Sequence, residues 1–283
     1  MSAQLINPRN FNVKNIVFAK CKHRTVPNQN ISYQSIRASY RYPNGKIGDF
    51  ILETPVVYSF GVQANYKDQK TKDEITNYSQ SFCLYSNHGP TKEELEFEKM
   101  INDIVDACKT ELVRQKVKYK GYEIEAGDSE LKRIKVLKIP LDENKNPKPD
   151  VGPRWYVRLV DKKDDDGEIV IKSLFYDTTG APIDPIDVGR CRTKSCIKFD
   201  SIFLNSAGIY PQFRVQESYV DIIDNTIRPM LSKNCLSEFG SDPIETEGKP
   251  QDKDNNTTGQ EDDEGGETDT DNESVSSDGG ISN

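Results

Sequence analysis

The chain has 283 residues and a formal net charge of −8, and this charge is unevenly distributed. Residues 241–283 contain 14 Asp or Glu and 2 Lys, so they carry −12 and the residues before them carry +4. No run of about 18 apolar residues is present, which excludes a bilayer-spanning helix, and residues 1–10 lack the apolar region of a secretion signal. We therefore expect an intracellular protein that does not contact membranes.

The first predicted elements are strands. From residue 31 to residue 42, apolar and aromatic residues alternate with Ser and Arg, and this period of two is typical of a strand with one buried and one cationic face. Residues 43–45 (Pro-Asn-Gly) predict a turn, because Asn and Gly tolerate positive φ. Residues 46–52 are expected to return as the hairpin partner. Further strands are predicted at 56–65 and 77–85.

One segment is predicted to be helical. Thr91 begins a capping box with Glu94, and apolar residues then recur at steps of three and four. The pattern predicts a single amphipathic helix at 92–114 that packs its apolar stripe on a sheet.

The second half of the chain again predicts strands, followed by a short helical or irregular stretch at 221–235. The Asp-Asp-Asp-Gly sequence at 164–167 is interpreted as a hairpin turn, since it lacks the alternating ligands of a calcium loop. Many short strands and one main helix indicate a mostly β (α+β) fold, an elaborated oligonucleotide-binding (OB-type) Greek-key barrel, although a sandwich has the same periodicity. The predicted strands are 131–139, 154–160, 168–176, 195–204 and 210–220.

The sequence contains little machinery for catalysis. It lacks a glycine-rich phosphate loop before a helix, a nucleophile elbow and a metal-binding histidine pair. His88 is interpreted as a loop residue. The six cysteines lie mostly in apolar patterns, and the spacing of Cys191 and Cys196 is too loose for a zinc knuckle. We expect reduced, buried thiols, no metal, no cofactor and no enzymatic activity.

Cationic and aromatic residues recur together on the predicted strands. In the sequence Arg-Trp-Tyr-Val-Arg-Leu, alternation places Arg154, Tyr156 and Arg158 on one face. A tyrosine between two arginines suits single-stranded nucleic acid, because the ring stacks on a base while the guanidinium groups meet phosphates. Such residues are also ordinary on solvent-facing strands, so the indication comes from the whole set. The candidate nucleic-acid-binding residues are Tyr33, Arg37, Arg41, Arg154, Tyr156, Arg158, Lys172, Tyr176 and Arg214.

Residues 241–283 are interpreted as a disordered acidic tail on a folded body at 1–240. The tail has too few large apolar side chains to offset the entropy of ordering. Its charge density imitates that of a phosphate backbone, so we expect it to compete with DNA for the body. We expect that DNA binding displaces the tail and that the displaced tail then becomes available to replication proteins.

Resemblance to a known family lies in three stretches: 53–62 (ETPVVYSFGV), 78–108 (YSQSFCLYSNHGPTKEELEFEKMINDIVDAC) and 198–220 (KFDSIFLNSAGIYPQFRVQESYV). They resemble the single-stranded DNA-binding proteins of nucleocytoplasmic large DNA viruses. The resemblance implies an oligonucleotide-binding barrel, no catalysis, and sequence-tolerant binding of displaced strands in viral genome replication, recombination or repair. It also implies an acidic C-terminus and a location in the host cytoplasm (the viral factory) or nucleus during infection.

Single-stranded DNA binding is thus the leading hypothesis from the sequence. One alternative is a structural or interaction protein, such as a virion or assembly component, in which the tail confers solubility. Another is RNA binding, since base stacking does not detect the 2′-hydroxyl group. The sequence leaves homo-oligomerisation, cooperativity and site size open.

Overall fold

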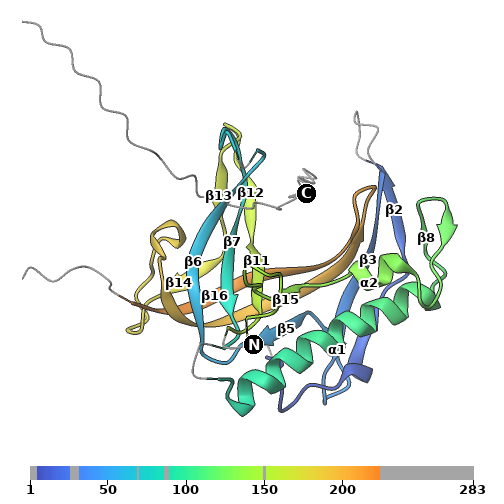
Figure 1. The fold of residues 1–283 in the computed structure, drawn as a ribbon, viewed down its shortest axis with the longest axis horizontal. Coiled ribbons are helices and arrows are strands. Elements are labelled where there is room, and N and C mark those ends of the chain that lie inside the picture. Colours follow the sequence, from blue (N-terminus) through green and yellow to red (C-terminus); the bar gives the residue numbers. More distant parts are fainter. Residues whose placement is uncertain (1–4, 26–31, 69, 86–88, 149–150, 224–283) are drawn as a thin grey trace, which may run out of the picture. The chain divides into compact units, whose positions relative to one another are not determined.

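A computed structural model of the chain describes residues 5–25, 32–68, 70–85, 89–148 and 151–223 (Figure 1). These residues belong to one compact unit. The predicted tail, His88 and most of the stretch 221–235 lie outside the described residues.

The described residues form two α-helices, two 3-10 turns and sixteen strands. The helical elements are α1 (Lys92–Arg114), α2 (Ser129–Arg133), η1 (Val13–Asn15) and η2 (Pro185–Asp187). The strands are β1 (Ile16–Phe18), β2 (Lys22–Thr25), β3 (Ser32–Arg41), β4 (Ile47–Gly48), β5 (Phe50–Glu53), β6 (Val57–Tyr66), β7 (Ile75–Cys83), β8 (Lys118–Tyr119), β9 (Tyr122–Glu123), β10 (Leu137–Lys138), β11 (Arg154–Leu159), β12 (Asp161–Lys163), β13 (Ile169–Ile171), β14 (Leu174–Tyr176), β15 (Cys191–Leu204) and β16 (Ile209–Ile222).

Five of these strands close into a barrel. β6 pairs with β7, β7 with β11, β11 with β16, and β16 with β15, which returns to β6. The β11–β16 pair is parallel and the other four are antiparallel. A closed five-stranded barrel of this kind, with one main helix, is the OB-type fold that the strand pattern predicted. The sandwich alternative is wrong, because the strands close on themselves.

The two longest strands extend beyond the barrel. β15 pairs along one edge with β6, then β5, then β3, while β16 follows its other edge. β1, β2 and β4 pair with β3 and widen this extension. In Figure 1, α1 lies beneath β3 and β5, and the β12–β13 hairpin points to the opposite side. The barrel wall and its extension therefore form one bent sheet.

The core is a single cluster that joins the barrel to α1. Trp155 of β11 packs against Phe82 of β7, Phe97 of α1 and Phe213 of β16, with ring centroids 6.0, 6.1 and 5.1 Å away. Aromatic rings bury large areas and add orientation-dependent attraction. This contact set fixes which side of β11 faces inward.

The helix begins and ends where the sequence predicted. Thr91 accepts a hydrogen bond from the backbone N–H of Glu94, and the Glu94 carboxylate accepts one from the backbone N–H of Thr91. These bonds satisfy two backbone donors that the first helical turn leaves open. No helix among the described residues is both long and apolar enough to cross a membrane.

Both predicted turns are confirmed. Gly45 adopts a φ of +78° in the turn between β3 and β4, and its N–H donates a hydrogen bond to the Tyr42 carbonyl. Gly167 adopts a φ of +86° and donates a hydrogen bond to the Asp164 carbonyl, which closes the β12–β13 hairpin. Each glycine therefore occupies a left-handed position that the reversal of the chain requires.

Several predicted strands are wrong in their extent. The stretch 131–139 contains the end of α2 and the short strand β10. The stretch 168–176 is two strands, because β13 pairs with β12 whereas β14 pairs with β16. Only the first part of 46–52 returns along β3, as β4, and β5 pairs with β15. These strands are short, so distant partners decide their pairing more than local pattern does.

Candidate nucleic-acid interface

Strand β11 presents a cationic and aromatic row on the outside of the barrel. Trp155, Val157 and Leu159 are buried. Alternation therefore points Arg154, Tyr156 and Arg158 outward, as predicted, and Tyr156 is 40% exposed. The buried row holds the outward row in place, because each inward side chain packs in the core.

Arg154 crosses β7 to reach an aromatic side chain of β6. Its guanidinium carbon lies 4.9 Å from the centroid of the Phe60 ring, which also makes an edge contact with Tyr58 at 5.1 Å. Ser79 and Ser81 on the intervening strand are buried. The larger side chains of the strands on either side, including Arg154 and Phe60, therefore form the surface here. A guanidinium over a ring is attracted by the ring's quadrupole and still presents N–H donors.

Arg214 of β16 joins this row. It lies directly opposite Arg158 in the parallel β11–β16 pairing, and its Nη1 donates to the Leu159 carbonyl over 3.5 Å. Lys138 of β10 places its Nζ 5.3 Å from the centroid of the Tyr156 ring. We name Arg154, Tyr156, Arg158 and Arg214 the β11 group.

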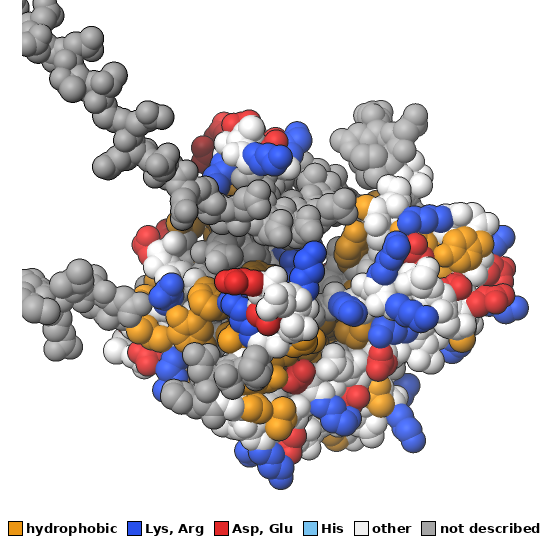
Figure 2. Space-filling model, in the orientation of Figure 1, with side chains coloured by type: hydrophobic (Ala, Val, Ile, Leu, Met, Phe, Trp, Pro, Cys, Tyr) orange, Lys and Arg blue, Asp and Glu red, His pale blue; other side chains and the backbone are white. Residues whose placement is uncertain are grey.

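Two arginines at the ends of this row lack a carboxylate partner. Within the described part of the chain, neither Arg154 nor Arg214 forms an ion pair with a carboxylate. In the orientation of Figure 1, Figure 2 shows the surface hollowed between the part that carries β12 and β13 and the part that carries β2 and β3, with Lys and Arg side chains along the hollow. Uncompensated cations beside an exposed ring can bind a phosphate and a base together.

A second set of aromatic and cationic side chains lies on the sheet extension. The Tyr33 ring of β3 packs against Phe203 of β15, with centroids 5.3 Å apart. Tyr210 of β16 pairs with Phe203 and is 40% exposed. On β2, Lys22 pairs with Ser35, and Arg24 pairs with Tyr33. We name Lys22, Arg24, Tyr33, Phe203 and Tyr210 the hairpin-tip group.

Between these groups the cations are neutralised. Asp49, which precedes β5, forms ion pairs with Arg37 of β3 at 3.3 Å and with Lys198 of β15 at 3.2 Å. Lys198 lies opposite Arg214, so this ion-pair set adjoins the β11 group. Arg37, a predicted site residue, is therefore outward as expected but already has a carboxylate partner.

The other predicted residues are more dispersed. Tyr176 of β14 stacks on Tyr219 of β16 at 5.3 Å, further along β16 than Arg214. Lys172 is exposed in the link between β13 and β14 and belongs to neither strand. Arg41 pairs with Ile47 of β4, about 13 Å along β3 from Arg37 at ~3.3 Å per residue.

Alternation alone missed Phe60, Phe203 and Tyr219, because each lies at or beyond a β-bulge. Asp200 and Gln216 are extra residues in the β15–β16 ladder, and Phe60 is an extra residue opposite β7. One extra residue reverses the face of every residue that follows it.

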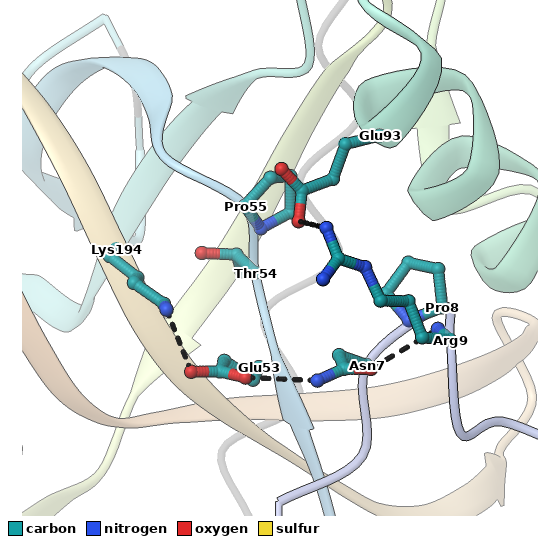
Figure 3. Close-up of a pocket in the computed structure, with 8 residues that line it drawn as sticks. All are labelled: Asn7, Pro8, Arg9, Glu53, Thr54, Pro55, Glu93 and Lys194. Carbon is teal, nitrogen blue, oxygen red and sulfur yellow. Dashed lines mark hydrogen bonds and ion pairs between the residues drawn. The ribbon is translucent and has the colours of Figure 1, made fainter.

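A small pocket of about 200 Å³ lies where the N-terminal segment meets β5, β15 and the start of α1 (Figure 3). Its cations are paired: Lys194 with Glu53 at 2.8 Å and Arg9 with Glu93 at 3.9 Å. The hydrogen bond from Lys194 lowers the pKa of the Glu53 carboxyl, with a further contribution from Asn7, although burial opposes the shift. These ion pairs link β15 to β5 and the N-terminal segment to α1, and they leave neither cation of the pocket unpaired for a ligand.

The cysteines offer no reactive site in the described part of the chain. Cys83, Cys108 and Cys191 are buried, Cys21 and Cys196 are half-buried, and all five are free thiols. Burial raises the pKa of Cys191 and of Cys196 to about 11, so both stay protonated at neutral pH. No group of three His, Cys, Asp or Glu residues that could hold a metal ion is found among the described residues. Cys235 lies outside them.

Comparison with known proteins shows a family and a similar solved structure. The family described as "Protein of unknown function (DUF2738)" matches residues 10–275. No curated protein matches the sequence. The chain is similar to the crystal structure of gp2.5, a single-stranded DNA binding protein encoded by bacteriophage T7, with 13% identity and a TM-score of 0.35. That match covers 65% of this chain and 98% of the phage chain.

Proposed function

This chain belongs to the family of proteins of unknown function DUF2738, and we propose that it binds single-stranded DNA, without sequence preference, along the outer face of β11. One observation carries the proposal. The exposed Tyr156 lies between Arg154 and Arg158 on the wall of an OB-type barrel, and the guanidinium of Arg214 adjoins them.

The geometry suits an unpaired strand better than a duplex. A base must leave its stack to lie on the Tyr156 ring, and in a duplex this costs base pairing as well. Arg158 and Arg214 are placed to meet phosphates on the same strand, and such contacts carry no base information. Stacking accepts every base because each has a π-face. The proposed binding is therefore tolerant of sequence and needs no catalysis.

We place this activity in the replication, recombination or repair of a viral genome, in the host cytoplasm or nucleus. The support for this setting is the resemblance of 53–62, 78–108 and 198–220 to viral single-stranded DNA-binding proteins.

Fluorescence anisotropy with a labelled oligo-dT, the same sequence as a duplex, and an oligo-U of equal length tests the proposal. We expect the oligo-dT to bind more tightly than the duplex, with affinity falling as salt rises. No binding of any strand at about 0.1 M salt contradicts it and favours a structural or interaction protein. A clear preference for oligo-U over oligo-dT indicates an RNA-binding protein instead.

The acidic tail is proposed to compete with DNA for the body and to recruit replication proteins once it is displaced. Deleting residues 241–283 should tighten oligo-dT binding, most of all at low salt, because the deletion removes a −12 competitor of the DNA. The matched control keeps the tail length and changes all 14 acids to Asn or Gln. Competition by charge predicts the same tightening in both variants, and unchanged affinity in both refutes it.

Asp49 should weaken binding in the full-length protein, because it neutralises Arg37 and Lys198 beside the β11 group. Replacing Asp49 by Asn should raise the affinity for oligo-dT a few-fold. It should also steepen the slope of log K against log salt by ~0.7, the value for one cation on a single strand, because Arg37 is released whereas Lys198 keeps Asp200 at 3.6 Å. Asp103→Asn, which frees Lys99 on α1, removes the same charge and serves as the control. Equal effects of the two variants refute a local role.

A further inference from the structure

Like the β11 group, the hairpin-tip group combines cationic and aromatic side chains, but it lies on the sheet extension. Its rings come from β3, β15 and β16, and its cations come from β2. Within the described residues, Lys22 and Arg24 form no ion pair with a carboxylate, unlike Arg37. Both side chains are exposed.

Strand pairing puts these five residues on one side of the sheet. Lys22 lies opposite Ser35, which lies opposite Phe203, which lies opposite Tyr210. Arg24 lies opposite Tyr33, in the next row of the same face along the β2–β3 pair. Directly opposed residues in a ladder point to the same face. The buried residues of the same strands, such as Ile36 and Ile202, occupy the other face.

The same rule connects this face to the β11 group. Arg37, Ser201 and Gln212 form one row across β3, β15 and β16, and the Ser201 hydroxyl donates to the Gln212 amide oxygen over 3.0 Å. The next row along β15 and β16 contains Lys198 and Arg214, and Arg214 leads to Arg158. A polar strip, in which Asp49 neutralises Arg37 and Lys198, therefore runs from the β11 group to the hairpin-tip group.

We infer that the hairpin-tip group is a second subsite for single-stranded nucleic acid, and that one strand crosses from Tyr156 to the Tyr33–Phe203 pair. A base packs against this ring pair or Tyr210, and Lys22 and Arg24 hold the adjoining phosphates. This inference rests on the proposed function, since it extends the same binding surface. The inference predicts a minimum oligonucleotide length for full affinity, because a short oligonucleotide reaches one subsite and a longer one reaches both.

A length series of oligo-dT from about 4 to about 16 nucleotides, the range covered by single OB folds, tests the inference. The wild-type affinity should rise in two stages. The double variant Tyr33→Leu with Phe203→Leu should bind the shortest oligonucleotides as the wild type does, and lose about tenfold or more on the longest. A variant with Tyr156→Ala should lose affinity at every length.

A second variant guards against an effect of misfolding, since Tyr33 and Phe203 are half-buried. Lys22→Gln with Arg24→Gln changes only exposed side chains and should flatten the salt dependence for long oligonucleotides alone, by up to ~1.4 in slope. Lys92→Gln with Lys99→Gln on α1 is the charge-matched control. Equal losses at all lengths, or no difference from the control, overturn the second subsite while leaving the β11 group intact. Absence of oligo-dT binding by the wild type overturns the proposed function itself.

Discussion

Replacing Tyr156 by Ala is expected to weaken oligo-dT binding by roughly 5- to 150-fold, which corresponds to ~1–3 kcal/mol for the loss of one base stack. The side chain points away from the core and is 40% exposed, so its removal should leave the fold intact. The contact with Lys138 is lost as well, but a cation over an exposed ring contributes only ~0.5–1 kcal/mol.

The salt dependence separates stacking from charge. The Tyr156→Ala variant should keep the wild-type slope of log K against log salt, because no phosphate contact is removed. Arg214→Gln should instead make the slope shallower by ~0.7. Tyr122→Ala is the matched control, since Tyr122 is 43% exposed on β9, in the separate β8–β9 sheet. Equal loss in the two tyrosine variants would show that Tyr156 is not at the interface.

Replacing Gly61 by Ala should destabilise the barrel by several kcal/mol. Gly61 follows the β6 bulge with a φ of +88°, and an added Cβ would overlap the carbonyl oxygens of Val188 and Gly189. The left-handed conformation costs an Ala ~1–2 kcal/mol, and forced overpacking typically costs ~1–3 kcal/mol more. The Val62 N–H also donates to the Val188 carbonyl, so this contact closes the barrel wall at that point.

Gly45→Ala isolates the backbone part of this effect. Gly45 has a φ of +78° in the β3–β4 turn, and no atom lies within 4 Å of its added Cβ. Its variant should lose only the ~1–2 kcal/mol of conformational strain. Denaturant unfolding of both variants measures the difference. Similar free energies of unfolding for the two would contradict the close approach of β6 to the segment before β15.

Local signals predicted the parts of the fold that local interactions determine. The helix boundaries at Lys92 and Arg114 follow from the capping box and the apolar stripe, both of which are readable in one window of sequence. The row of Arg154, Tyr156 and Arg158 follows from alternation, because β11 contains no bulge. The mostly β class was predictable because it needs only the number and kind of elements.

The features that the sequence did not predict depend on pairing between segments that are far apart in the chain. Closure of the barrel depends on β15 returning to β6 and on the short β11–β16 contact, and neither has a local signature. The bulges at Asp200 and Gln216 each shift the alternation by one residue, so Phe203 and Tyr219 face outward where simple alternation predicts that they face inward. The neutralising role of Asp49 was equally hidden, since its partners are 12 and 149 residues away in sequence.

Photocrosslinking with an oligonucleotide that carries a reactive base at each position in turn, followed by mapping of the modified peptides, tests the central claim most directly. The account predicts crosslinks on the β11 segment 154–158 and on the start of β16. Crosslinks confined to α1, or to the pocket beside Glu53 and Lys194, would contradict it.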